Sequence, residues 1–183
     1  MSRDAIQHSI VEIVAASGVG GLSVRAVAAR AGVAIGTVQH HFPTRSAMIA
    51  AAMTIVEETA EAIEAGSGRS DPVERLTGLT DLLIPSSVES TAGRVWLAFA
   101  AQAAVDEAVA AQYRRTWSRL QRSLAELLAR ARPELAWSRA DAAATELLAL
   151  LDGLSVAVLV EPGRISVGTA REIAQRRLAE LLT

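Results

Sequence analysis

The most suggestive binding chemistry lies in a short run of small, hydroxyl, amide and imidazole side chains that reads IGTVQHH, at residues 35–41. Helical spacing directs Val38 and Phe42 toward a core. The residues that are then left facing outward are Gly36, Thr37, Gln39 and His40. Amide and hydroxyl groups on an exposed helix can hydrogen-bond base edges in a major groove, and Gln39 can bind adenine in a bidentate way. The pattern therefore indicates a helix that reads double-stranded DNA.

Arg25 stands at the start of another expected helix, where the positive end of the helix dipole disfavours a cation. An anionic partner such as a phosphate would explain this placement, and an ordinary solvated arginine is the alternative. His40 and His41 have a similar alternative as plain surface histidines. They are not expected to share a metal ion, because adjacent helical residues lie about 100° apart and His8 is the only other histidine.

Two helices joined by a tight turn would hold these side chains. The first is expected over residues 23–31 with Ser23 as its N-cap, and the second over residues 35–41. Gly32 suits the left-handed conformation that a sharp turn between helices requires, because it has no Cβ. This arrangement has helix-turn-helix geometry.

The rest of the chain shows helical periodicity almost throughout. One helix that stops near Gly18 precedes the motif, and Thr44 caps a long helix after it. A break rich in glycine and serine follows at residues 66–70. Further helices are expected after Asp71-Pro72 and at about residues 91–104, 106–131, 138–160 and 169–182. No period-two pattern is long enough for a sheet, so the expected fold is all-α with about nine helices, a three-helix N-terminal unit and a larger helical bundle.

Composition excludes several classes of protein. The chain of 183 residues is 51% hydrophobic, which excludes intrinsic disorder. It has no cysteine, so disulfides and thiolate metal sites are excluded as well. The longest apolar run contains Asp152 and Gly153 and is too short for a membrane span. We expect a soluble, cytoplasmic protein with no membrane partner and no cofactor.

The net charge of −2 argues against DNA binding until it is divided by position. Residues 1–46 hold four arginines and two acidic residues, a net charge of +2, whereas the remainder carries −4. All 18 positive side chains are arginine, which suits phosphate binding, although a genomic bias explains it equally well. Because the basic excess of residues 1–46 is modest, we expect two copies to act together as a dimer.

Over residues 1–56 the chain resembles the DNA-binding segment of the TetR family of bacterial repressors. The resemblance rests on an ordered set of short matches, which are Val27-Ala28, Ala31-Gly32-Val33, Gly36-Thr37-Val38, His41-Phe42 and Thr44-Arg45. It implies a helix-turn-helix DNA-binding domain at 1–46 and a ligand-binding and dimerisation domain at 47–183. It also implies a homodimeric, ligand-responsive regulator, a repressor that binds a palindromic operator and is released by a small-molecule effector.

The resemblance assigns DNA contacts to both helices of the motif and to the start of the next one. The residues concerned are Ser23, Arg25, Gly36, Thr37, Gln39, His40, His41, Thr44 and Arg45. Thr44 and Arg45 would hold a phosphate through a helix N-terminus and a cation. For Ser23 and Thr44 a purely capping role is the open alternative. The family often has tyrosine where Gln39 stands, so its operator sequences do not carry over to this chain.

The aromatic side chains are few and fall at helical spacing in the second half. The residues predicted to line an effector pocket are Trp96, Phe99, Gln102, Tyr113 and Trp117. Ordinary core packing is the alternative for each aromatic residue. The segment RVWLAFAAQA is similar to the corresponding part of the TetR branch that includes the choline-responsive betaine regulators. An aromatic box can hold a quaternary ammonium, but this spacing alone does not assign the ligand.

The last two expected helices predict a dimer surface, because the helix at 138–160 is apolar over most of its circumference. The residues assigned to this interface are Leu147, Leu151, Leu154, Val158, Ala170, Ile173, Arg177 and Leu181. The alternative is that the first of these helices is simply central in one chain. We interpret Asp152, within the apolar stripe, as a hydrogen-bonded structural carboxylate.

Two other classes of protein are alternatives to a DNA-binding regulator. An enzyme is not expected, because no phosphate-binding loop, metal spacing or nucleophile with an adjacent base is visible. The second class is a helical ligand-binding or partner-binding module whose motif no longer touches DNA. Salt-dependent binding to DNA would separate that class from the regulator.

Overall fold

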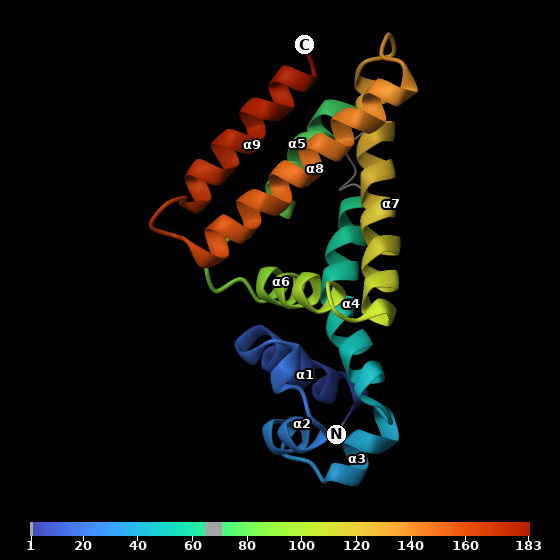
Figure 1. The fold of residues 1–183 in the computed structure, drawn as a ribbon, viewed down its shortest axis with the longest axis vertical. Helices are drawn as coiled ribbons and strands as arrows, with labels where there is room; N and C mark the ends of the chain where they lie inside the picture. Colours follow the sequence, from blue (N-terminus) through green and yellow to red (C-terminus); the bar gives the residue numbers. More distant parts are fainter. Residues whose placement is uncertain (1, 65–70) are drawn as a thin grey trace. The chain divides into compact units, whose positions relative to one another are not determined.

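The computed structural model describes residues 2–64 and 71–183, which contain no strand. The break expected at residues 66–70 lies outside these residues. Nine α-helices and one short 3-10 turn are found among the described residues (Figure 1). They are α1 (Arg3–Ser17), η1 (Val19–Gly21), α2 (Val24–Ala31), α3 (Ile35–His41), α4 (Arg45–Glu64), α5 (Pro72–Leu83), α6 (Thr91–Ala103), α7 (Glu107–Ala131), α8 (Trp137–Val160) and α9 (Val167–Leu181). The predicted all-α fold is confirmed.

Local capping explains where the first helices begin and end. Ser23 Oγ accepts a hydrogen bond from the Ala26 backbone N–H at 3.1 Å, so it caps α2 as predicted. At the other end of α2, Gly32 has φ 66° and ψ 35°, the left-handed conformation expected for the turn. The Val33 N–H then reaches the Ala28 carbonyl at 3.0 Å, which satisfies an end carbonyl of the helix.

The chain divides into two compact units, Met1–Glu58 with Thr91–Tyr113, and Thr59–Ser90 with Arg114–Thr183. We refer to these as unit one and unit two. The sequence predicts domains at 1–46 and 47–183, which divide the chain at a different point. This division stays a prediction. The difference arises because α6 is remote from the motif in sequence but packs against α1.

In unit one, α1, α2 and α3 surround a small apolar core. Ile6, Ile10, Val27, Val38 and Phe42 are all almost fully buried. The N-terminal part of α4 is hydrogen-bonded to α1, where Gln7 Nε2 donates to Thr54 Oγ1 at 2.6 Å. Gln112 on α7 donates to Glu57 on α4 at 3.2 Å. These two contacts attach α4 to both α1 and the start of α7.

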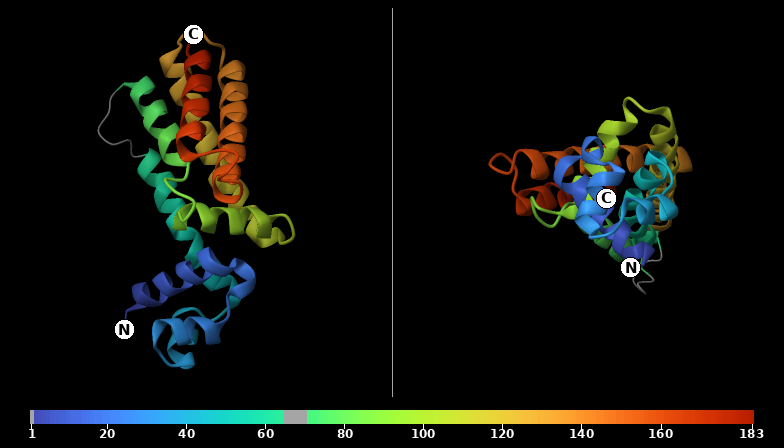
Figure 2. Two further views of the ribbon diagram at one scale, coloured as in Figure 1. Left: turned by 90° about the vertical axis from the view of Figure 1, so that its left-hand side faces the viewer. Right: turned by 90° about the horizontal axis from the view of Figure 1, so that it is seen from below.

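In unit two, α8 is a central core helix. Figure 1 and Figure 2 both show α8 and α9 side by side, and α5 packs against each of them. The core that these helices share with α7 is built mainly of leucine and alanine. α8 is also the one described helix that is long and apolar enough to span a membrane by length and composition. Its apolar side chains instead form the core of unit two.

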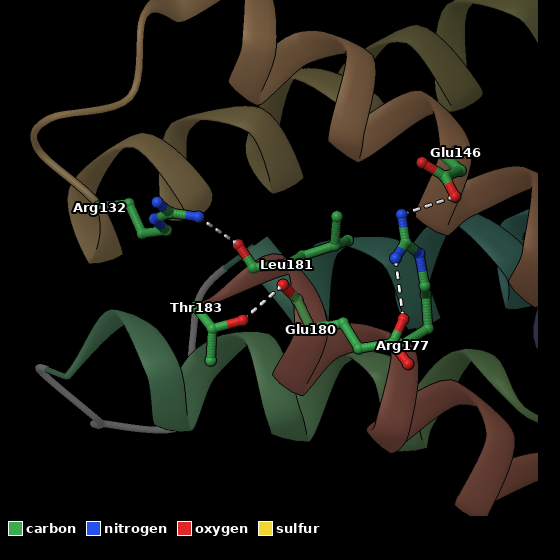
Figure 3. A network of polar contacts seen from close by, with 6 residues as sticks. All are labelled: Arg132, Glu146, Arg177, Glu180, Leu181 and Thr183. Atoms are coloured by element: carbon green, nitrogen blue, oxygen red, sulfur yellow. Dashed lines mark hydrogen bonds and ion pairs between the residues drawn. The ribbon is translucent and has the colours of Figure 1, made fainter.

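A polar network joins α8, α9 and the segment after α7 within unit two (Figure 3). The Arg177 guanidinium pairs with Glu146 at 2.7 Å and with Glu180 at 2.9 Å, and these carboxylates raise its pKa. Arg132 donates to the Leu181 carbonyl at 3.3 Å. The network fixes the C-terminal end of α9 against its neighbours.

Candidate nucleic-acid interface and effector site

One face of α3 is exposed and carries small and polar side chains, and the opposite face is buried. Val38 is 0% and Phe42 1% exposed, so these two side chains hold α3 to unit one. Gly36, Gln39 and His40 are exposed, whereas Thr37 and His41 are half-buried. The rings of His40 and His41 meet edge to face with their centroids 5.1 Å apart. The outward set expected from the sequence is therefore on the surface, apart from Thr37, which is partly covered.

Ile35 belongs to this surface too, and the sequence reasoning missed it. Its side chain is 45% exposed at the first position of α3. Spacing from Val38 would place it in the core by helical periodicity, which is why the pattern concealed it. The signal available in the sequence was its position at the start of the expected reading helix. An exposed apolar side chain there can contact a thymine methyl group.

Gly36 is not required by the packing of the protein itself. A Cβ added at this position would meet no atom within 4 Å. A helical glycine is less stable than alanine by about 1 kcal/mol, and no contact within unit one explains its presence. Close approach of another molecule to the α3 backbone would explain it.

The start of α2 carries an exposed cation. Arg25 is exposed, and among the described residues no hydrogen bond or ion pair involves its guanidinium. Arg30, one turn later, differs because it pairs with Glu12 at 2.7 Å. That pairing lowers the pKa of Glu12 and raises the pKa of Arg30. Arg25 thus contributes an uncompensated positive charge to this face.

Thr44 and Arg45 both contact the protein's own backbone. Thr44 Oγ1 accepts from the Ala47 N–H at 3.0 Å, so the predicted capping of α4 is confirmed. Arg45 Nη2 donates to the Val19 carbonyl at 2.6 Å, and its Nε donates to the Leu22 carbonyl at 3.4 Å. Arg45 therefore joins the start of α4 to the turn before α2. Because a guanidinium has five N–H groups, three remain for a phosphate.

The residues predicted to line an effector pocket are distributed over both units. Trp96 and Phe99 are buried in unit one, where core packing explains them. Gln102 Nε2 donates to Asp106 at 3.4 Å, and Tyr113 is half-buried. Trp117 belongs to unit two. A pocket formed by these five residues stays a prediction.

Trp117 has a charged partner that lies on α8. Its indole Nε1 donates to Asp152 Oδ2 at 3.1 Å and to Oδ1 at 3.3 Å. Burial raises the pKa of Asp152 to about 6, and the indole hydrogen bond opposes that shift. The hydrogen-bonded state expected for Asp152 is confirmed, and the sequence did not reveal its partner. Among the described residues no cluster of three groups suited to a metal ion occurs.

Most of the large side chains assigned to the dimer interface are buried within one chain. Leu147, Leu151, Leu154, Val158 and Ala170 are at most 5% exposed, inside the core of unit two. Ile173, Arg177 and Leu181 are half-buried. The alternative of a central helix therefore accounts for the apolar character of α8, because its large apolar side chains pack in the core that neighbouring helices of the same chain form. A dimer through α8 and α9 stays a prediction.

The exposed surface of α8 includes a stripe of smaller residues, beside larger exposed side chains such as Trp137, Arg139 and Glu146. The residues of this stripe are Ala142, Thr145, Ala149, Gly153 and Val160. We call these five residues the outer stripe of α8. A Cβ added at Gly153 would meet nothing within 4 Å, so the fold of one chain does not require this glycine.

Two family models match the chain. Residues 8–52 match the bacterial regulatory proteins of the tetR family, and residues 72–183 match the BetI-type transcriptional repressor C-terminal model. The HTH-type transcriptional regulator BetI of Stenotrophomonas maltophilia (strain R551-3) is 29% identical over 177 residues, which cover 94% of this chain and 88% of that protein.

Solved structures agree with these matches over the whole chain. A transcriptional regulator from Rhodococcus sp. Rha1 is 30% identical with a TM-score of 0.85, covering 100% of this chain and 96% of that one. A transcriptional regulator from Saccharomonospora viridis, solved in complex with choline, is 22% identical with a TM-score of 0.86 and covers 97% and 95%. At that identity the second likeness concerns the fold alone.

The family is one of transcriptional regulators that bind DNA through this motif, and it is not a family of enzymes. The expectation that the chain is not an enzyme is confirmed by this membership. The helix-turn-helix in unit one and the helical C-terminal half both correspond to the matched segments. The chain belongs to the TetR family of bacterial transcriptional regulators, with a C-terminal half of the BetI type.

Proposed function

We propose that this protein is a homodimeric repressor that binds a palindromic operator and is released by a small-molecule effector. The observation that carries the proposal is the outward surface of α3, where Gly36, Gln39 and His40 are exposed above a buried Val38. Small and amide-bearing groups on such a helix fit a major groove, where amide side chains pair with base edges.

The bases would be read from α3, and the phosphates would be held from the elements beside it. Gln39 has the donor and acceptor pair that matches adenine, and Ile35 can contact a thymine methyl. Arg25, whose guanidinium has no partner among the described residues, and Arg45, with three remaining N–H groups, would be the cations for the phosphates. Ser23, Thr37, His40, His41 and Thr44 complete the proposed DNA contacts.

The homodimer would use the outer stripe of α8 together with the half-buried residues of α9. Gly153 supports this assignment, because an exposed mid-helix glycine costs about 1 kcal/mol in helix stability and allows another helix to approach closely. Ile173, Arg177 and Leu181 on α9 are the residues of the earlier assignment that remain partly accessible. Two copies would set the separation of the two α3 helices at about 34–36 Å or a multiple of it.

Effector binding would change the separation of the two reading helices. The contacts of α4 in unit one support a transmission role, since α4 is bonded to α1 through Gln7–Thr54, to the turn before α2 through Arg45, and to α7 through Glu57–Gln112. A shift of α4 would therefore move Arg25 and α3 relative to DNA. A coupling of about 1–3 kcal/mol would reduce operator affinity about 5- to 150-fold. The protein would act in the cytoplasm.

Footprinting on the DNA upstream of the protein's own gene tests this function. We expect a protected region with two-fold symmetric half-sites, and loss of protection when an active effector is added. A matched protein with Gln39→Ala serves as the control, because it keeps the phosphate contacts and loses a base contact. Absence of salt-dependent binding to any fragment would reject the repressor and favour a ligand-binding module that no longer touches DNA.

A further inference from the structure

Asp152 is a half-buried acidic side chain in an apolar helix, and among the described residues its carboxylate has no cationic partner. The only hydrogen bonds described for its carboxylate come from the Trp117 indole, at 3.1 and 3.3 Å. Burial and this indole are the two influences on its pKa, and no arginine contributes to it. A charged carboxylate that is partly shielded from water is destabilising unless a cation or further donors satisfy it.

Several other acidic residues of the chain have an arginine partner. Glu12, Glu134, Glu146 and Glu161 each pair with an arginine at 2.7 Å; Glu12 is half-buried like Asp152, and the other three are exposed. In a chain with 18 arginines, the half-buried carboxylate of Asp152 is without one among the described residues. Asparagine at this position would accept the same indole hydrogen bond without the cost of burying a charge. The charge therefore calls for an explanation beyond the contact with Trp117.

We propose that Asp152 and Trp117 form the cation-binding part of the effector site, and that the effector carries a protonated amine. A carboxylate has about four lone-pair positions, and the indole N–H occupies only part of them. An N–H-bearing ammonium donates to the rest, and the carbon atoms next to the nitrogen lie against the indole ring. Both side chains are partly accessible, so a small molecule can reach them. This inference rests on the proposed ligand-responsive function.

The competing explanation is that Asp152 only joins α7 to α8. The chain contains an internal comparison for that role, because Gln121 on α7 donates to Asp141 on α8 at 3.1 Å. Both pairs connect the same two helices through a carboxylate. Both carboxylates are half-buried, so the two pairs are closely comparable. Asp141→Asn is therefore the matched control for Asp152→Asn.

The experiment measures release of the full-length protein from its operator. The probes are butylamine, benzylamine and 1,4-diaminobutane as protonated amines, with butanol, benzyl alcohol and butyrate as neutral and anionic counterparts, and choline as a cation without an N–H. We expect at least one amine to lower operator affinity fivefold or more, while its alcohol or carboxylate counterpart has no effect. Asp152→Asn should weaken the response to that amine at least tenfold, and Asp141→Asn should leave it unchanged.

The pH dependence provides a second readout that a merely structural contact would not produce. Amine affinity should be constant above about pH 7 and fall toward tenfold per pH unit below pH 6, because the carboxyl becomes protonated while the amine keeps its charge. Asp152→Asn should remove this dependence. Trp117 fluorescence should report the same binding, with Trp117→Phe losing the signal and leaving Trp96 and Trp137 as the background.

The outcomes separate this inference from the repressor function. Operator binding by Asp152→Asn without any amine should equal that of the unsubstituted protein, because Asp152 lies outside the DNA-binding motif. If that holds and no amine releases the protein, the cation site is rejected and the repressor stands. A response to the alcohols or to butyrate, an unaltered response in Asp152→Asn, or a response to choline equal to that of the amines would also overturn it.

Discussion

At the scale of single residues, several side chains on the surface that we propose faces DNA are better explained by a partner than by the protein's own stability. Gly36 has open space where a Cβ would lie, and Ile35 is exposed although it is apolar. Arg25 is a cation at a helix start without a partner among the described residues. Each is unfavourable or neutral for the fold, and all three lie in the helix-turn-helix.

Gly36→Ala should therefore separate stability from function. Because the backbone at Gly36 is helical and its surroundings are open, the substitution should leave the melting temperature unchanged or raise it, in line with the ~0.5–1 kcal/mol advantage of alanine. The added methyl should lower operator affinity tenfold or more by holding α3 away from the bases. Gly20→Ala, also in open space, is the matched control and should bind normally. Normal operator binding by Gly36→Ala would contradict a close approach of DNA.

Substitutions of Arg25 and Arg45 should change the salt dependence of DNA binding alike, but they should differ in their effect on the stability of the protein. Arg25→Gln and Arg45→Gln should each reduce the slope of log affinity against log salt by about 1, the value for one phosphate contact. Only Arg45→Gln should also lower the free energy of unfolding, by about 1–2 kcal/mol, because it loses hydrogen bonds to the Val19 and Leu22 carbonyls. An unchanged salt slope in Arg45→Gln would assign this arginine a purely structural role.

Asp152 should make the stability of the free protein fall with rising pH. The folded-state pKa of about 6 lies above the ordinary value of ~3.9, so the native state binds this proton more tightly than the unfolded state. The resulting stabilisation is present below about pH 4 and is lost as pH rises to about 6. Compared with the unsubstituted protein, Asp152→Asn should gain about 2 kcal/mol between pH 4 and pH 7.5. Urea unfolding at both pH values measures this, and a pH-independent difference would refute it.

At the scale of helices, local signals predicted the boundaries well. Caps at Ser23, Thr44 and Asp71 and the turn at Gly32 lie within a few residues of what they stabilise, so they can be read without the fold. The ends expected for α6 to α9 agree with the structure within two residues. Contacts between helices carry no such signal. The packing of α6 on α1 and the partner of Asp152 both join residues remote in sequence.

The apolar character of α8 shows the same limit. Periodicity indicated a helix that is apolar over most of its circumference. It does not distinguish a face that packs within the same chain from a face that packs against a second copy. In the structure the large leucines face the core of unit two, and the exposed side includes the outer stripe of alanine, threonine, glycine and valine. The assignment of individual interface residues therefore depended on burial, which the sequence does not contain.

Charges placed on the outer stripe should disrupt the proposed dimer. Ala149→Glu and Gly153→Glu project from the exposed face of α8, so they should leave the fold of unit two intact and shift the protein toward monomer. Light scattering after size exclusion measures the mass, and operator affinity should fall with it. Ala108→Glu, exposed on α7, is the control and should remain dimeric. A dimer that persists in both α8 variants would place the interface elsewhere.

At the scale of the whole molecule, the charge distribution favours a DNA-binding head on an acidic body. Residues 1–46 carry a net charge of +2 and the remainder −4. Within the first segment the Arg30–Glu12 pair is internally compensated, so Arg3, Arg25 and Arg45 against Asp4 carry the excess. Such a small excess makes a single copy a weak binder at physiological salt, and two copies double the number of phosphate contacts. Dimerisation and DNA binding are in this way expected to depend on each other.

The most direct test of the central claim, that the exposed face of α3 reads bases, is the operator preference of Gln39→Ala. Affinities of this variant and the unsubstituted protein are measured over every single-base change of the operator, at two salt concentrations. The account predicts that discrimination of about 1–3 kcal/mol is lost at one symmetric pair of positions, with the salt slope unchanged. An unaltered preference at every position, or a uniform loss of affinity with a reduced salt slope, would contradict it.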